Sequence, residues 1–139
     1  MKATLIFASF MLLTGCQSAV PDQAALAILL NTPPDPHLAF CLSISGKDPS
    51  PAVLSALQKT KWRVVPASTC LDVQFGVVTP NRLRAERVGI DGFHRVVPWR
   101  ATAEFWTQSS PLSGRSWRIK LKRVGDAWVV ESTELVSMS

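Results

Sequence analysis

The sequence is poor in the residues that most often carry chemistry. It has only two histidines, His37 and His94, and neither has another ligand-type residue at the spacing of a metal site. Its seven glycines are dispersed, so no phosphate-cradling loop is evident, and no serine stands in a Gly-x-Ser-x-Gly motif. We therefore expect no metal, no cofactor and no catalytic residue, and a noncatalytic role.

Long hydrophobic runs are also missing. The longest, residues 3–13, is far below the roughly 20 residues that a membrane-spanning helix needs. A retained transmembrane helix is therefore disfavoured. The 139 residues suffice for one domain, and with 47% apolar residues and five tryptophans there is ample material for a folded core.

Basic residues are concentrated in the middle of the chain. Residues 82–123 hold ten lysines and arginines against Glu86, Asp91 and Glu104, whereas residues 124–139 hold three acids and no base. The ordinary explanation of such charge is a solvated surface. The alternative is a surface that faces anionic headgroups, lipopolysaccharide phosphates or an acidic partner.

The first residues have the layout of a secretory leader, with Lys2 before the apolar run. The run closes with Leu13-Thr14-Gly15-Cys16, which resembles the lipobox of bacterial lipoproteins. The resemblance implies removal of residues 1–15 as a signal peptide and a diacylglyceryl group on Cys16, which anchors the chain in a membrane. By the family's sorting rule, Gln17 implies the outer membrane, facing the periplasm. The alternative is an ordinary leader in which Cys16 is incidental.

Three cysteines less a lipidated Cys16 leave an even pair, Cys41 and Cys70, in an oxidising compartment. We predict that they form a disulfide. Two buried free thiols are the alternative, because a sequence does not show whether two Cα atoms lie within bonding reach.

Two helices are expected near the start of the mature chain. Residues 22–30 are good helix formers, with Asp22 as a candidate cap, and Pro33 and Pro34 forbid continuation. Ser50-Pro51 begins a second helix that runs to about Lys59. Residues 37–45, 62–66 and 71–79 are expected to be strands, the first containing Cys41.

From residue 84 the pattern is mostly strand. Asp91-Gly92 and Gly125-Asp126 are two-residue hairpin signals. A two-residue turn at Gly125-Asp126 would pair Leu121 with Val130, Arg123 with Trp128 and Lys120 with Glu131. The buried face would then hold five residues, namely Trp117, Ile119, Leu121, Trp128 and Val130.

These elements predict an α+β fold, with two short helices packed on a curled antiparallel sheet. Its last forty residues, ending in Trp128-Val129-Val130, loosely resemble the nuclear-transport-factor-two-like and cystatin-like families, which implies a small apolar pocket between helix and sheet. We expect a tether and short helix over residues 16–36 and a single domain over residues 37–139.

The candidate contact residues lie in this basic, strand-rich part. Most tryptophans are expected in the core, with Trp99 the least buried, so the predicted contact surface is Trp99, Arg100, Arg118, Lys120 and Lys122. The sequence favours an envelope lipoprotein that binds an envelope protein or an anionic surface, and not nucleic acid. The alternatives are a ligand-binding protein or enzyme with a cone-shaped pocket, and a structural envelope component.

Overall fold

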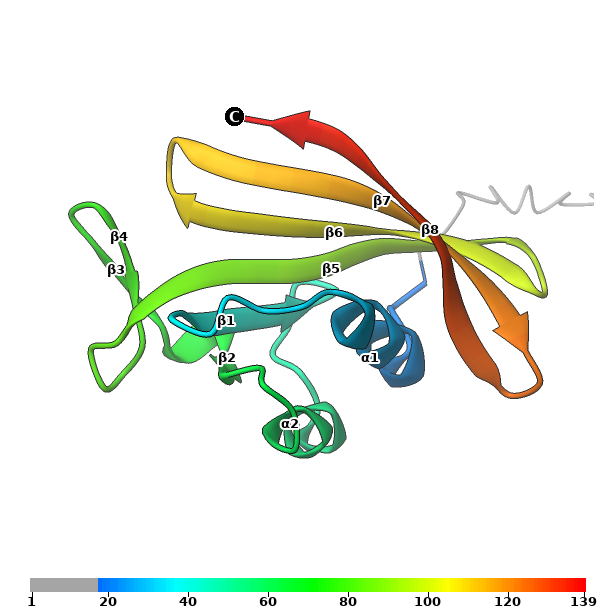
Figure 1. The fold of residues 1–139 in the computed structure, drawn as a ribbon, viewed down its shortest axis with the longest axis horizontal. Helices are drawn as coiled ribbons and strands as arrows, with labels where there is room; N and C mark the ends of the chain where they lie inside the picture. The colour runs from blue at the N-terminus through cyan, green and yellow to red at the C-terminus, as the bar shows by residue number, and fades with distance from the viewer. Residues whose placement is uncertain (1–17) are drawn as a thin grey trace, which may run out of the picture.

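A computed structural model describes residues 18–139 as two helices against one face of an open mixed sheet (Figure 1). The predicted lipobox and Cys16 lie outside the described residues. The helices are α1 (Asp22–Asn31) and α2 (Pro51–Gln58). The strands are β1 (Ala39–Ile44), β2 (Val64–Pro66), β3 (Leu71–Val73), β4 (Gly76–Val78), β5 (Arg84–Val97), β6 (Arg100–Ser110), β7 (Ser113–Val124) and β8 (Ala127–Met138).

The sheet has the strand order β2-β1-β5-β6-β7-β8, and the small hairpin of β3 and β4 joins it through β5. The predicted antiparallel sheet is wrong at β1, which runs parallel to both β2 and β5. The reason is the helical crossover: α2 lies between β1 and β2 in the chain, and such a connection returns the second strand in the direction of the first. The long strands β5 to β8 form the expected antiparallel meander.

The two helices occupy nearly the predicted residues. Ser50 caps α2 as expected, with its hydroxyl accepting a hydrogen bond from the amide of Val53 at 3.2 Å. The predicted cap of α1 is wrong, because Pro21 stands at the cap position and Asp22 lies inside the first turn. The Asp22 carboxylate instead accepts a hydrogen bond from Ser50 at 2.7 Å, which joins the starts of the two helices.

The main core lies between the helices and the sheet. α1 contributes four fully buried residues to the same cluster as the long strands, so the predicted boundary at residue 36 falls in a loop of this unit. Ile119, Leu121 and Trp128 are buried in it, as predicted, with Trp117 and Val130 packed against them. β8 bends across α1, which gives the sheet its curl (Figure 1).

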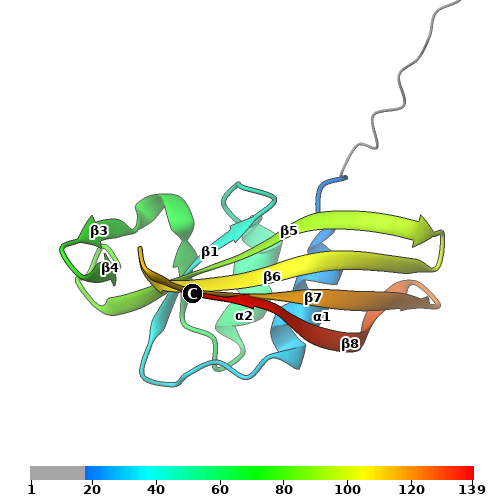
Figure 2. The same cartoon turned by 90° about the horizontal axis from the view of Figure 1, so that it is seen from above.

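A second, smaller core lies on the opposite face of β1. It contains the predicted disulfide between Cys41 and Cys70, whose Cα atoms are 6.3 Å apart, together with Val77 and Ala85. The expected single strand at 71–79 is instead the two-stranded β3–β4 hairpin, which turns around Phe75. In Figure 2 this hairpin lies at the opposite end of the molecule from the turns that join β5 to β6 and β7 to β8.

The two predicted hairpin turns have different outcomes. Gly125-Asp126 turns between β7 and β8, and Leu121 pairs with Val130 as expected. A register shift after that pair places Lys120 opposite Ser132, so its predicted pairing with Glu131 is wrong. Asp91-Gly92 is not a turn: β5 continues through it with a register shift, and Gly92 takes a φ of +64°. Glycine at positive φ suits a bulge as well as a turn.

Candidate functional site

The helix side of the sheet is only partly covered by α1, which ends at Asn31. Thr32 then leaves the helix in an extended conformation, and two consecutive prolines prevent another turn. Beyond this end the inner face of β5, β6 and β7 remains open. The result is a cleft of about 370 Å³ between the segment 32–35 and the sheet.

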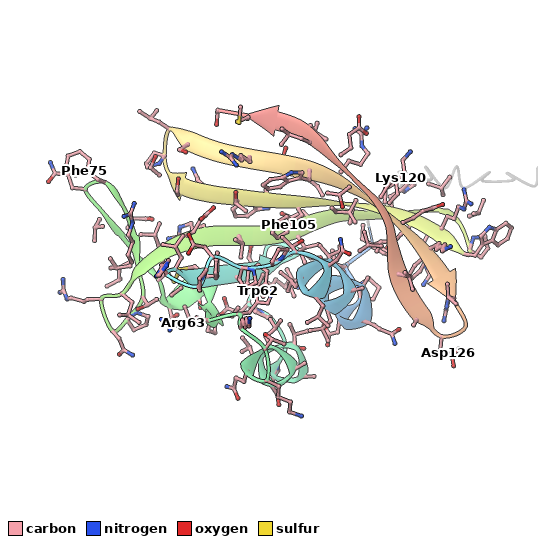
Figure 3. The ribbon with its side chains drawn as sticks, viewed as in Figure 1. Trp62, Arg63, Phe75, Phe105, Lys120 and Asp126 are labelled. Atoms are coloured by element: carbon pink, nitrogen blue, oxygen red, sulfur yellow. A yellow bond between two sulfur atoms is a disulfide. The ribbon has the colours of Figure 1, made fainter. Side chains whose placement is uncertain are left out.

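Four aromatic side chains line the cleft. Phe105 and Trp117 are paired across β6 and β7, with ring centres 5.6 Å apart. Phe40 and Trp62 stand edge to face, with ring centres 4.8 Å apart. Figure 3 shows Trp62 between the helices and the strands, below Phe105. The cleft therefore has an apolar, aromatic base of the kind that ligand sites use to bury apolar groups.

Trp62 is held rigidly in this arrangement. Its indole Nε1 donates a hydrogen bond to the carbonyl oxygen of Leu29 at 3.0 Å, which satisfies a carbonyl near the end of α1. The amide of Trp62 donates to the hydroxyl of Thr60 at 3.2 Å. The aromatic base thus depends on the last turn of α1 and on the loop after α2.

Charged groups stand around the aromatic base. Glu86 of β5, Arg115 of β7 and Asp35 of the segment after α1 all belong to the lining, together with the hydroxyl groups of Thr32, Thr107, Ser109 and Ser113. The inner face of the sheet thus changes from apolar beneath α1 to polar beyond it. A ligand with an apolar body and polar ends would fit this arrangement of apolar and polar groups.

Exposed apolar side chains lie beside the cleft on β8, the edge strand of the sheet. Leu135 of β8 pairs with Trp117, and Met138 pairs with Arg115, so both side chains extend the inner face outward. Leu135 is 52% exposed and Met138 is 66% exposed. An apolar surface therefore runs from the cleft to the free edge of β8.

The predicted contact residues lie elsewhere. Arg100 pairs with Lys122 across β6 and β7, while Lys120 and Arg118 follow on the same outer face of β7. Figure 3 shows Lys120 on the side of the strands away from the helices. Trp99 lies in the turn between β5 and β6 and is 59% exposed. The five residues thus gather on the outer face and at one end of the sheet, and none belongs to the cleft.

The cleft was not foreseen residue by residue. Its lining comes from six separate stretches of the chain, including Phe40, Glu86 and Arg115. One feature of the sequence could have indicated it. The alternation of inward-facing residues on β5 to β7 extends over more residues than the short helix α1 can cover. Neither histidine of the described chain lines the cleft. Across residues 18–139, no group of three His, Cys, Asp or Glu side chains is arranged to hold a metal ion.

No family model, curated protein or solved structure matches this chain. The likeness to nuclear-transport-factor-two-like and cystatin-like proteins therefore stays a prediction. The lipobox also stays a prediction, since it lies before Ser18. Within the part of the chain that the structure describes, neither helix has the length and apolar character needed to cross a membrane.

Proposed function

We propose that this chain is a lipid-anchored protein of the bacterial envelope whose domain acts as a noncatalytic binding module. The lipobox-like segment ending in Cys16 supports the anchor. The binding role is carried by one observation, the aromatic cleft of about 370 Å³ that α1 leaves uncovered. We propose that the cleft receives an apolar segment of another envelope protein.

The surroundings of the cleft favour a protein segment as its occupant. The apolar surface continues through Leu135 to the edge of β8, where it is open along a strand. An extended peptide could cross the aromatic base and leave along this edge. Glu86 and Arg115 at the rim would add polar contacts that select the orientation of the segment.

Site-specific photocrosslinking in living cells tests this role. A photoreactive amino acid at Thr107, inside the cleft, is compared with one at its neighbour Gln108, which lies on the outer face of β6. We expect one defined adduct from position 107 and none of that mass from position 108. The same adducts from both positions, or no adduct from position 107, would contradict a binding role for the cleft.

The anchor has its own test. Metabolic labelling with a palmitate analogue should mark the natural chain, and the Cys16→Ser variant should lose the label, because only the thiol can receive the lipid. Undiminished labelling of the variant would refute the anchor.

A small apolar ligand is the second candidate occupant. The cleft volume lies within the range of small-molecule sites, about 300 to 1,000 Å³. The fluorescent probe N-phenyl-1-naphthylamine tests this alternative. Binding that Trp117→Ala weakens at least tenfold, and that an outer-face change such as Gln108→Ala leaves unaltered, would favour a small ligand.

A further inference from the structure

The end of the sheet that holds the β5–β6 and β7–β8 turns carries an unusual combination of exposed residues. We call segments 94–100 and 120–126 the hairpin-tip surface. Its exposed apolar side chains are Val96, Trp99 and Val124. Its cations are Arg95, Arg100, Lys120, Lys122 and Arg123, against the single carboxylate of Asp126. Aromatic and aliphatic residues among lysines and arginines are typical of surfaces that contact anionic bilayers.

The cations surround both faces of this end. Arg100 and Lys122 are paired on the outer face. On the inner face the guanidinium groups of Arg95 and Arg123 lie 5.6 and 5.9 Å from the ring centre of Trp128, which is buried and holds them in place. Because cations lie on both faces, this end can meet a negatively charged plane with the strands tilted toward it.

The two turns form one rigid unit. The amide of Arg123 donates a hydrogen bond to the carbonyl oxygen of Trp99 at 2.8 Å, which ties the first turn to β7. Arg100 also lies 3.7 Å from the carboxylate of Glu131 on β8. The backbone at Trp99 is therefore already ordered, so binding through this residue costs little conformational entropy.

The described chain begins near this end. The Ser18 hydroxyl donates to the carbonyl oxygen of Phe93 at 3.5 Å, and the Val20 amide donates to the hydroxyl of Ser45 at 2.8 Å. Phe93 lies on β5 roughly 20 Å from the Trp99 turn at the usual rise of a strand. In Figure 2 the blue start of the described chain lies in the half of the molecule that contains these turns.

Chain length limits where the lipid can be. Cys16 precedes Ser18 by two residues, so it lies within about 7 Å of it. The other prominent exposed aromatic, Phe75, is 84% exposed at the tip of the β3–β4 hairpin, at the far end of the longest axis (Figure 3). A bilayer that holds the lipid is therefore close to the hairpin-tip surface and distant from Phe75.

We infer that the hairpin-tip surface docks on anionic phospholipid of the same membrane that holds the anchor, with Trp99 at headgroup level. This inference rests on the anchor of the proposed function. Because Ser18 lies roughly 20 Å from the Trp99 turn and Cys16 within only about 7 Å of Ser18, the strands lie tilted toward the bilayer, with the β3–β4 hairpin at the end farther from it.

The test uses the mature protein as isolated from the cell envelope, reconstituted into vesicles of phosphatidylcholine with or without phosphatidylglycerol. Lipids brominated near the headgroup quench tryptophan fluorescence at short range. We expect strong quenching only with phosphatidylglycerol, and loss of most of it in Trp99→Phe. Adding Phe75→Trp to that variant moves the exposed indole to the other end of the molecule, and we expect it to restore none of the quenching.

The charge requirement is tested in the same vesicles. Arg100→Gln with Lys122→Gln should reduce the docked-to-undocked ratio about fivefold per charge at low salt. The matched control is Lys59→Gln with Lys61→Gln, which removes two exposed cations after α2 and should change nothing. Equal quenching with and without phosphatidylglycerol, no effect of Trp99→Phe, or recovery through Phe75→Trp would overturn the docking.

Flotation separates this inference from the anchor. Protein that floats with both kinds of vesicle but shows no quenching of Trp99 contradicts the docking alone. Protein that floats only with phosphatidylglycerol vesicles, with Trp99 quenched, contradicts the anchor and supports the docking. Protein that floats with neither contradicts both.

Discussion

The indole ring of Trp106 occupies the space that a side chain at Gly89 would need. A Cβ at Gly89 would overlap two ring carbons of Trp106, well inside van der Waals contact. The two residues are direct partners across β5 and β6. The ring is also held in place by its Nε1, which lies on the same side and donates a hydrogen bond to the carboxylate of Asp91 at 2.7 Å.

Gly89→Ala should therefore displace the Trp106 ring and break its bond to Asp91. We expect a loss of about 1–3 kcal/mol in the free energy of unfolding, the usual cost of an overfilled site. Denaturant titration measures the loss, and tryptophan emission reports the displaced ring. Gly76→Ala is the control, since a Cβ there meets only one atom, at 3.4 Å. Equal stability of both variants would show that the ring moves freely.

Trp128→Ala should cost about 3–5 kcal/mol of stability, because the indole is buried and packs edge to face on Phe93 with ring centres 5.6 Å apart. Lys122→Ala, on the opposite face of the sheet, should change stability by less than about 0.5 kcal/mol. Chemical denaturation of the two variants compares them. Similar losses of stability in the two variants would mean that the buried and exposed faces of the sheet are assigned wrongly.

Removing both bridge cysteines, Cys41→Ala with Cys70→Ala, should lower the stability by about 2–5 kcal/mol, the usual cost in small exported domains. Thiol titration of the unfolded natural protein checks the bond itself, since a lipidated Cys16 does not react. Fewer than one free thiol per chain is expected. Two free thiols without reductant would contradict the bridge in the exported protein.

Asp48 accepts hydrogen bonds from the hydroxyl and, at 3.0 Å, from the amide of Ser68. These bonds, the hydroxyl first, hold the pKa of Asp48 below its ordinary 3.8. The stability they contribute is present above that ordinary value and is lost as the pH falls through the lowered pKa of the folded state. Ser68→Ala should raise the pKa of Asp48 toward 3.8 in an NMR titration of the carboxyl carbon. An unchanged pKa would assign the shift to another cause.

Local chemistry made parts of the fold predictable. Ser50-Pro51 marks the start of α2 because a cap and a proline act within one turn, and Gly125-Asp126 marks a turn because alternation on both sides agrees with it. The register fails one residue further on, at Glu131. A bulge inserts a single unpaired residue of almost any type, so no sequence pattern marks it.

Features that depend on distant segments were harder to predict. β1 is buried at nearly all of its positions. Such a continuous apolar run is typical of parallel strands, so the sequence did contain an indication of its parallel pairing. The cleft has no comparable signal. It exists because α1 ends at Asn31, short of the polar end of the inner face, and its lining combines Phe40, Glu86 and Arg115 from three strands.

The parallel position of β1 affects how the chain reaches this fold. Cys41 on β1 pairs with Arg87 on β5, 46 positions later, whereas β5 to β8 pair through consecutive tight turns. Contacts between residues so far apart in the chain slow folding, because closing the connecting loop costs entropy before the contacts that offset this cost have formed. Once Cys41 is bonded to Cys70, only about 17 residues remain to be closed, which lowers the loop-closure cost by about 0.9 kcal/mol. The docking of β1 beside β5 should therefore proceed faster in the oxidised chain than in the reduced one.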